Sequence, residues 1–547
     1  MRWGVGIVAT ILVSGCASSS SPASDEPVCY EARIDELLKT RTDDPDLLFL
    51  RQIRKDLARC SRLADLRPTS LVLASVVNEY ISEGVDAENR AEFDRLLQLW
   101  IVRDPGNAVP ILLKAQLAIS AGDLEGGIQT ILRASRLPVM RTYELEAQQE
   151  TWRIMKKEGL DDIALYGAVV ARWHYELRKS YLGACGLLTV LAQDHELRRR
   201  FEQAQDCIEA EHFLTRRFLD SNPTWLDWSL SGDRGVWTSA RLCELSLATG
   251  DSEAAGKYAN EAREYWRKSK ALRLAMQRDI QDNPMVPAFK EAGMWKPSTG
   301  EAGGFESIAG ILGATPEQWQ RFWRALRNRE STIRPYVEEQ LLKGNAVTTL
   351  ERLTPDDHRQ LDSVQAPITQ FWESRADFYP EAGRPGAGDR LIRWLKLTGT
   401  DDYEDAPDFM RERAFHALLR RADKETLAKL RLLLDDKEQE NIFGRIAVIL
   451  VAHGDQGDAV KKQILACVEI EDSAVGWAAG RLGLKTAISA LVENLTLEFW
   501  PDRFYLRFDE ALGAYLALRD LAGQDFGFNS AKWEEWAKRE GHLKSDD

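Results

Sequence analysis

The sequence predicts an all-α protein, an α-solenoid of stacked helical hairpins. Apolar residues recur with the helical period along nearly all of its 547 residues, and the alternation typical of a half-buried strand is scarce. Helix start signals recur too, in the form of Pro directly after Asp or Thr. Proline suits the first position of a helix because the N–H group that it lacks would have no partner within the helix there. These signals are Asp44–Pro45, Asp104–Pro105, Thr315–Pro316 and Thr354–Pro355. Tight turns are expected where apolar-periodic runs stop at glycine, namely at Gly122, Gly250, Gly454 and Gly523.

The first 15 residues have the layout of a secretory signal. Arg2 supplies positive charge, Trp3–Val13 is almost entirely apolar, and small residues follow. The apolar run is shorter than the roughly 20 residues that a membrane-spanning helix needs. It ends in Val-Ser-Gly-Cys, which resembles the lipobox of bacterial lipoproteins. The resemblance implies a lipoprotein signal peptide at residues 1–15 and a lipid on Cys16. A buried N-terminal helix with an incidental cysteine is the alternative.

The same resemblance implies a location in the cell. The residue after Cys16 is Ala17 rather than aspartate, which in lipoproteins favours the outer membrane, facing the periplasm. Each buried acyl methylene contributes about 0.8 kcal/mol, so the two or three chains of a lipoprotein anchor it stably. Residues 16–27 are Ser-rich and lack large apolar side chains, so we expect a flexible tether there. The protein is therefore expected to be lipid-anchored in the cell envelope.

Residues 28–270 are expected to form an array of helical hairpins. The segments Leu112–Ser135 and Ala240–Ala262 each read as a helix, a Gly-Asp turn and a second helix. Both resemble tetratricopeptide repeats, in which small residues let the paired helices approach closely. The small residues at those positions are Ala115, Gly127, Ala134, Cys243, Ala255 and Ala262. The resemblance implies a tetratricopeptide-like array, and an irregular helical bundle is the alternative.

Residues 271–385 are less regular and are expected to be an irregular helical junction. Two segments rich in Pro and Gly, Asp282–Gly304 and Tyr379–Asp389, mark it as a long loop and a domain boundary. An amphipathic helix is expected between them, at Pro316–Glu330.

Residues 386–547 are more orderly, with glycine-marked turns about every 30 to 40 residues, which indicates a solenoid. The apolar helices of this part resemble HEAT repeats. The closing segment, Glu510–Gly541, resembles the last helices of uncharacterised HEAT-repeat proteins from planctomycete-type bacteria, where an L-x-G-x-D-F-G turn precedes a W-x-x-W helix. Trp533 and Trp536 lie one turn apart, and we expect them to cap the open end of the core.

The chain contains seven cysteines. If Cys16 carries lipid, six remain, an even number that suits an oxidising compartment. Cys29 and Cys60 flank the expected hairpin turn at Thr42–Asp46 at similar distances. Antiparallel helices would bring them together, so they form the first candidate disulfide.

Cys185 and Cys207 flank the segment Ala192–His195 in the same manner and form a second candidate disulfide. Cys243 and Cys467 lie on apolar helix faces and are expected to be buried thiols.

Composition and motifs exclude several function classes. The net charge of −14 argues against nucleic acid as a partner, because phosphate binding needs a basic face. No motif for nucleotide binding, metal binding or nucleophilic catalysis occurs, so we predict no catalytic residues, no cofactor and no metal. The charged segment Glu196–Glu202 is interpreted as a salt-bridged helix face.

Tryptophan is the unusual feature of the composition, with 17 residues. Trp225, Trp228 and Trp237 fall in a stretch rich in loop residues, and Trp295 falls in the junction loop. Exposed aromatic side chains in loops stack on sugar rings or anchor a partner peptide, which makes these four the candidate contacts. Packing in the core is the alternative reading of all four.

The sequence therefore predicts a lipid-anchored envelope scaffold or adaptor that binds other envelope proteins through the concave surfaces of its repeats. One alternative is a lipoprotein that binds cell-wall glycan, with peptidoglycan as its partner and Trp225, Trp228 and Trp237 exposed and coplanar. The other is an envelope enzyme without a recognisable motif, which requires a deep pocket with paired carboxylates or a buried histidine.

Overall fold

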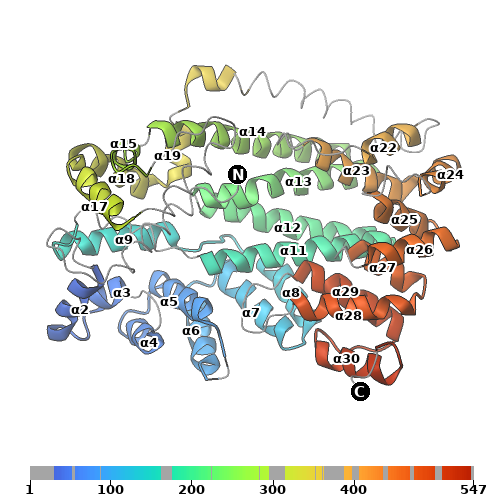
Figure 1. Ribbon diagram of the computed structural model, residues 1–547, viewed down its shortest axis with the longest axis horizontal. Helices are drawn as coiled ribbons and strands as arrows, with labels where there is room; N and C mark the ends of the chain where they lie inside the picture. The colour runs from blue at the N-terminus through green and yellow to red at the C-terminus, as the bar shows by residue number, and fades with distance from the viewer. Residues whose placement is uncertain are drawn as a thin grey trace.

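A computed structural model describes most of the chain (Figure 1). The described residues are 30–51, 56–86, 88–161, 175–222, 224–282, 284–294, 315–351, 353–359, 361, 387–396, 406–434, 442–468, 473–498 and 508–543. Within these ranges the chain forms helices joined by short turns, and its β-structure is one isolated bridge between Asn107 and Val139. Neighbouring helices pack in pairs along the chain. The prediction of an all-α solenoid of helical hairpins is confirmed.

The N-terminal helices pack against each other in chain order, from α2 to α8. Their bounds are α2 Tyr30–Thr40, α3 Pro45–Arg51, α4 Leu57–Leu66, α5 Ser70–Glu83, α6 Arg90–Arg103, α7 Ala108–Ser120, α8 Leu124–Ala134 and α9 Glu144–Lys157. Helix α9 lies across α3 and α5.

Helix α11 is central, because it contacts α5 and α7 before it and α12, α27 and α29 after it. It spans Tyr175–Leu197. Three long helices follow it, each packed on the helix before it: α12 Phe201–Ser221, α13 Trp225–Thr249 and α14 Ser252–Asp282. The expected boundary at residues 270 and 271 falls inside α14, which is continuous there. The helices of the expected junction are α15 Val286–Glu291, α17 Pro316–Arg327, α18 Glu330–Lys343 and α19 Asn345–Glu351.

The C-terminal helices fold back onto the N-terminal array (Figure 1). They are α22 Ala387–Leu395, α23 Ala406–Arg421, α24 Lys424–Leu433, α25 Phe443–Ala452, α26 Asp458–Cys467, α27 Ser473–Arg481, the 3₁₀ turn η3 Lys485–Ala487, α28 Ile488–Glu498, α29 Phe508–Ala522 and α30 Ser530–Arg539. Helices α27 and α29 pack directly on α11. The turn at Gly527 approaches the turn at Gly122 between α7 and α8. One hydrophobic core therefore runs from Ile34 in α2 to Ala537 in α30.

Most of the expected helix ends are confirmed. The four predicted glycine stops all have positive φ, between 62° and 94°. Asp44 accepts from the first backbone amides of α3, and Thr315 forms a capping box with Gln318 at the start of α17. The start predicted at Asp104 is wrong. Asp104 directly follows the last residue of α6, and α7 begins four residues later at Ala108, capped by the side chain of Asn107.

The candidate disulfide between Cys185 and Cys207 is wrong, since both thiols are free and buried. Helix α11 continues through Ala192–His195 to Leu197, so the turn lies at residues 198–200. Cys185 is fourteen residues before the middle of that turn and Cys207 eight after it, an offset of roughly 9 Å at 1.5 Å per residue. Burial raises the pKa of each thiol to about 12, so both stay protonated.

The remaining cysteines lie as follows. Cys243 and Cys467 are buried, as predicted, and so is Cys60 on α4. Cys29 lies outside the described residues, so the Cys29–Cys60 disulfide stays a prediction.

The close packing of α7 and α8 depends on Gly127. A Cβ at this position would lie 2.2 Å from Cγ1 of Ile119 and 3.1 Å from the carbonyl oxygen of Ala115. We expect Gly127→Val to lower the free energy of unfolding by about 1–3 kcal/mol through overpacking, measured by urea denaturation. Gly256→Val is the matched control, because nothing lies within 4 Å of a Cβ there. Equal effects at the two sites would contradict close packing as the cause.

Candidate functional site

A buried histidine lies between α12, α13 and α14. His212 is 1 % exposed, and its Nε2 lies 3.0 Å from Oε2 of Glu261. Its Nδ1 lies 3.4 Å from the hydroxyls of Thr238 and Ser239. The contact with His212 contributes most to holding the pKa of the Glu261 carboxyl below its ordinary value. The order hydroxyl, imidazole and carboxylate is the one that activates a serine nucleophile in hydrolases.

The surroundings of His212 favour a structural role over catalysis. Ser239 and Thr238 are both fully buried, so a substrate has no access to either hydroxyl. Thr238 also donates to the carbonyl of Arg234 one turn earlier, an ordinary contact of a helical threonine. The Nδ1 contacts are longer than a well-formed hydrogen bond. The cluster therefore ties three helices together through buried polar contacts.

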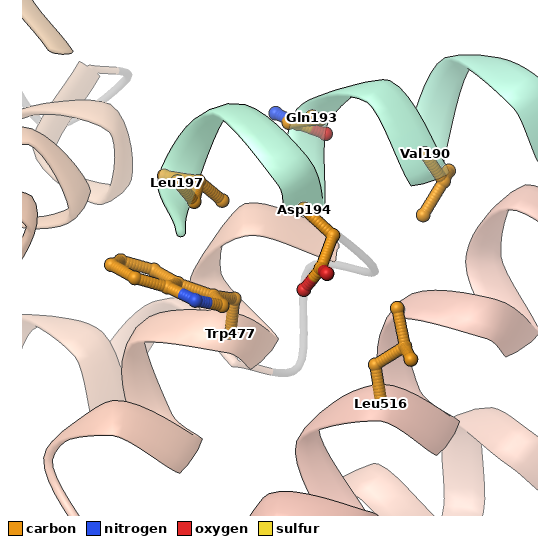
Figure 2. Close-up of a pocket in the computed structure, with 7 residues that line it drawn as sticks. Val190, Gln193, Asp194, Leu197, Trp477 and Leu516 are labelled. Carbon is orange, nitrogen blue, oxygen red and sulfur yellow. The ribbon is translucent and has the colours of Figure 1, made fainter. Parts of the chain in front are cut away.

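A small pocket lies where α27 and α29 meet α11 (Figure 2). Asp194 points from α11 toward the gap between Trp477 and Leu516, and it also binds Arg198 at 2.9 Å. The pocket holds about 10 Å³, which is room for one water molecule. Its lining residues are Val190, Gln193, Asp194, Leu197, Trp477, Gly513 and Leu516. This space is too small for an organic substrate.

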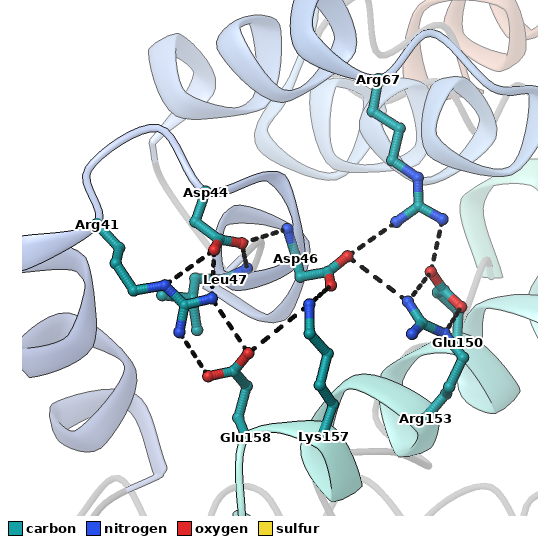
Figure 3. A network of polar contacts seen from close by, with 9 residues as sticks. All are labelled: Arg41, Asp44, Asp46, Leu47, Arg67, Glu150, Arg153, Lys157 and Glu158. Atoms are coloured by element: carbon teal, nitrogen blue, oxygen red, sulfur yellow. Dashed lines mark hydrogen bonds and ion pairs between the residues drawn. The ribbon is translucent and has the colours of Figure 1, made fainter.

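A network of alternating charges joins α3 to α9 (Figure 3). Asp46 at the start of α3 binds Lys157 at 2.6 Å and Arg67 at 3.2 Å. Arg67 continues to Glu150 of α9 at 2.6 Å, and Glu150 also binds Arg153. Arg41 adds ion pairs with Asp44 and Glu158, so acidic and basic side chains are balanced across the network. The network therefore fixes the position of α9 on the first hairpins and leaves no excess charge for a ligand.

The network makes the stability of the protein depend on pH in the acid range. Hydrogen bonds from Arg153 and Arg67 lower the pKa of Glu150 from 4.5 to about 2, against the opposing effect of burial. A carboxyl with a lowered folded-state pKa stabilises the protein above about pH 4.5, and the contribution is lost as the pH falls toward 2. We expect the melting temperature of the wild type to fall more steeply between pH 5 and 3 than that of Glu150→Gln. Parallel curves would contradict this linkage.

A second buried charge cluster joins the C-terminal helices to the array. Glu196, at the end of α11, binds Arg241 of α13 and Arg420 of α23, each at 2.5 Å. Its other oxygen lies 2.8 Å from Nδ1 of His416 in α23. Burial on its own raises the pKa of Glu196, but the two arginines and the histidine together hold it well below its ordinary value. Glu196 is therefore a buried carboxylate with three partners from two other helices, α13 and α23, and we refer to these residues as the Glu196 cluster.

The interpretation of Glu196–Glu202 as one salt-bridged helix face is wrong. Residues 198–200 form the turn after α11, and the side chain of Glu196 is 1 % exposed. Its partners lie 45 to 224 residues away in the chain, so no local spacing in the sequence points to the cluster.

The tryptophans expected in a loop lie on a helix instead. Helix α13 begins at Trp225, and a capping box between Thr224 and Asp227 starts it. Its small residues reflect close packing rather than a loop, because a Cβ at Gly235 would lie 2.8 Å from the ring of Tyr265 in α14.

The described tryptophans of α13 do not form a coplanar platform. Trp228 and Trp237 are nine residues apart, which places them on opposite sides of α13, about 180° apart. Trp228 lies against Tyr265 of α14, and Trp237 lies under Arg241, 4.9 Å from its guanidinium. The side chain of Trp225 and all of Trp295 lie outside the described residues.

Partly exposed aromatic side chains gather over α12, α13 and α14. We call Phe213, Trp228, Tyr258 and Tyr265 the aromatic stripe. Phe213 is 37 % exposed, and the other three are half-buried. The ring of His212, beneath them, makes edge contacts with Tyr258 and Tyr265.

Cations lie over three rings of the aromatic stripe. Arg217 covers Phe213 at 5.5 Å, Lys257 covers Tyr258 at 5.6 Å, and Lys268 covers Trp228 at 6.0 Å. Sequence reasoning had selected only Trp228 of this set, because the other members lie on helices that read as ordinary amphipathic segments.

No family model, no curated protein and no solved structure matches this chain. The fold and the side chains described above therefore carry the functional argument.

Among the described residues, no group of three or more His, Cys, Asp or Glu side chains is placed to hold a metal ion. None of the helices in the described ranges combines the length and apolarity that crossing a bilayer requires. The expected signal peptide, the tether and Cys16 lie outside those ranges and stay predictions.

Proposed function

We propose that the protein is a lipid-anchored scaffold of the bacterial cell envelope, which binds protein partners through surfaces of its helical repeats. In this proposal Cys16 carries the lipid, the first hairpins are tetratricopeptide-like and the C-terminal helices are HEAT-like, as in repeat proteins of planctomycete-type bacteria. The solenoid of hairpins supports it, since such folds present extended surfaces for binding.

The aromatic stripe is the observation that carries the proposal. Aromatic side chains and arginine are enriched where protein interfaces bury their energetically dominant residues. Phe213 and Tyr258 bring rings to the surface of adjacent helices, each with a cation beside it. Helices α27 and α29 pack on α11 and so occupy part of the surface of the array. The proposed contact surface is the aromatic stripe over α12, α13 and α14.

Crosslinking in cells tests the proposal. A photoreactive amino acid at position 213 should capture one or two envelope proteins from the membrane fraction, identified by mass spectrometry. The double variant Phe213→Ala/Tyr258→Ala should lose the same partners in affinity purification. Leu432→Ala is the control, because Leu432 is 73 % exposed on α24, outside the stripe. Retention of muropeptides without any protein above background would refute the scaffold and support the glycan alternative.

The anchor is tested separately. Cys16→Ser should move the protein from the membrane fraction to the soluble fraction and abolish labelling by a fatty-acid analogue. Unchanged fractionation would refute the lipid anchor while leaving partner binding to be judged by the crosslinking experiment.

A further inference from the structure

Helix α23 presents two chemically different sides. Phe415, Leu418 and Leu419 are buried apolar residues, and Phe415 lies 6.0 Å from the guanidinium of Arg445 in α25. The backbone of α23 packs on α22 and α25 of the C-terminal part. Arg413, His416 and Arg420 follow at i, i+3 and i+7, so they share one face of the helix.

The cationic face of α23 meets two buried carboxylates of the array. Arg420 and His416 bind Glu196 of α11, at 2.5 and 2.8 Å. Arg413 forms an ion pair with Glu244 of α13, whose side chain is 4 % exposed. Both carboxylates belong to helices that pack in the array without α23.

The contact of α23 with α11 and α13 differs in chemistry from the contact of α27 and α29 with α11. Helices α27 and α29 pack on α11 with apolar side chains, such as Trp477 and Leu516 around the small pocket. One partly exposed ion pair, between Arg198 and Asp520, adds to this contact. Helix α23 reaches α11 and α13 through long charged side chains. Apolar burial stabilises a contact by an amount that grows with area. A buried ion pair nearly breaks even against its desolvation, although it strongly specifies which partner fits. The α23 contact is therefore specific but weakly held.

We propose that the surface of α11 and α13 around Glu196 and Glu244 is a docking site for a basic helix, occupied by the chain's own α23. Helix α23 docks and undocks there while α27 and α29 stay on α11. A helix recognised by this site carries two cations seven residues apart on one face, with a third group between them that binds a carboxylate. The inference does not depend on the proposed scaffold function, because both sides of the contact belong to this chain.

Hydrogen exchange of the full-length protein tests the undocking. Glu196→Gln removes the charge that Arg420 and His416 share, so exchange of the α23 amides should rise by at least about tenfold. Amides of α27 and α29 should keep wild-type rates. Glu211→Gln is the matched control, because Glu211 is equally buried and pairs with Arg234 inside the array. A rise shared by α27 and α29, the same rise at α23 in both variants, or no rise would overturn the proposal.

A peptide tests the site itself. In the variant Arg413→Gln/Arg420→Gln the resident helix lacks its arginines, so the site should accept a labelled peptide of residues 406–421 added in solution. Binding is measured by fluorescence anisotropy. Adding Glu196→Gln to that variant should weaken binding of the peptide by about tenfold or more. Equal binding by the two variants, or no binding by the first, would show that Glu196 and Glu244 do not form a docking site.

Discussion

Replacing Arg178 with methionine is expected to lower the free energy of unfolding by about 3–5 kcal/mol. Arg178 is fully buried in α11, where it binds Glu144 of α9 at 2.5 Å and Asp227 of α13 at 2.6 Å. It also donates to the hydroxyl of Thr224, which caps α13. The variant leaves two buried carboxylates without the positive charge that compensates them. Urea denaturation followed by circular dichroism measures the loss.

An exposed arginine provides the control for this prediction. Arg59 binds Asp56, with both side chains 50 % exposed, so Arg59→Met should cost less than about 1 kcal/mol. In the Arg178→Met background, Asp227→Asn removes one uncompensated charge and should recover part of the loss. A cost of 1 kcal/mol or less for Arg178→Met alone would show that the buried cluster does not hold α9, α11 and α13 together.

Replacing Trp533 with alanine is expected to destabilise the C-terminal end by about 3–5 kcal/mol. Trp533 is fully buried, and its indole N–H donates to the carbonyl of Gly527 at 2.7 Å. Its ring meets the edges of Phe526 and Trp536 at 4.8 and 5.8 Å. Because the turn at Gly527 approaches the α7–α8 turn, the loss should reach the N-terminal array.

Hydrogen exchange resolves where that loss occurs. In Trp533→Ala, exchange should rise in α28, α29 and α30 and in the amides around Gly122, while α2 to α4 keep wild-type rates. Trp533→Phe keeps an aromatic ring but loses the hydrogen bond, so its effect should be smaller. A rise confined to α30 would mean that the closing helix does not cap the core, contrary to the role predicted for Trp533 and Trp536.

Local signals in the chain predicted most helices and many of their ends. The helical period, the capping residues at Asp44 and Thr315 and the four glycine stops act within a few residues, so they are visible in sequence. The same approach failed at α13, where small residues such as Gly235 were interpreted as a loop. These residues are small because α14 packs closely on α13 there. Such packing depends on both helices, so the sequence of α13 alone does not show it.

The candidate disulfide failed for a related reason. A shift of the α11–α12 turn by a few residues changes which side chains are opposite each other along the two helices.

The sequence by itself determined the all-α class, the hairpin pattern and the burial of Trp533 and Trp536, because these follow from periodicity and local backbone chemistry. Only the tertiary structure decided that the C-terminal helices cover α11 and that Glu196 meets His416 and Arg420. It also decided that aromatic side chains from three helices meet beside His212. The physical reason is distance along the chain: partners 45 to 224 residues apart leave no spacing to recognise, and their encounter depends on how the whole solenoid closes.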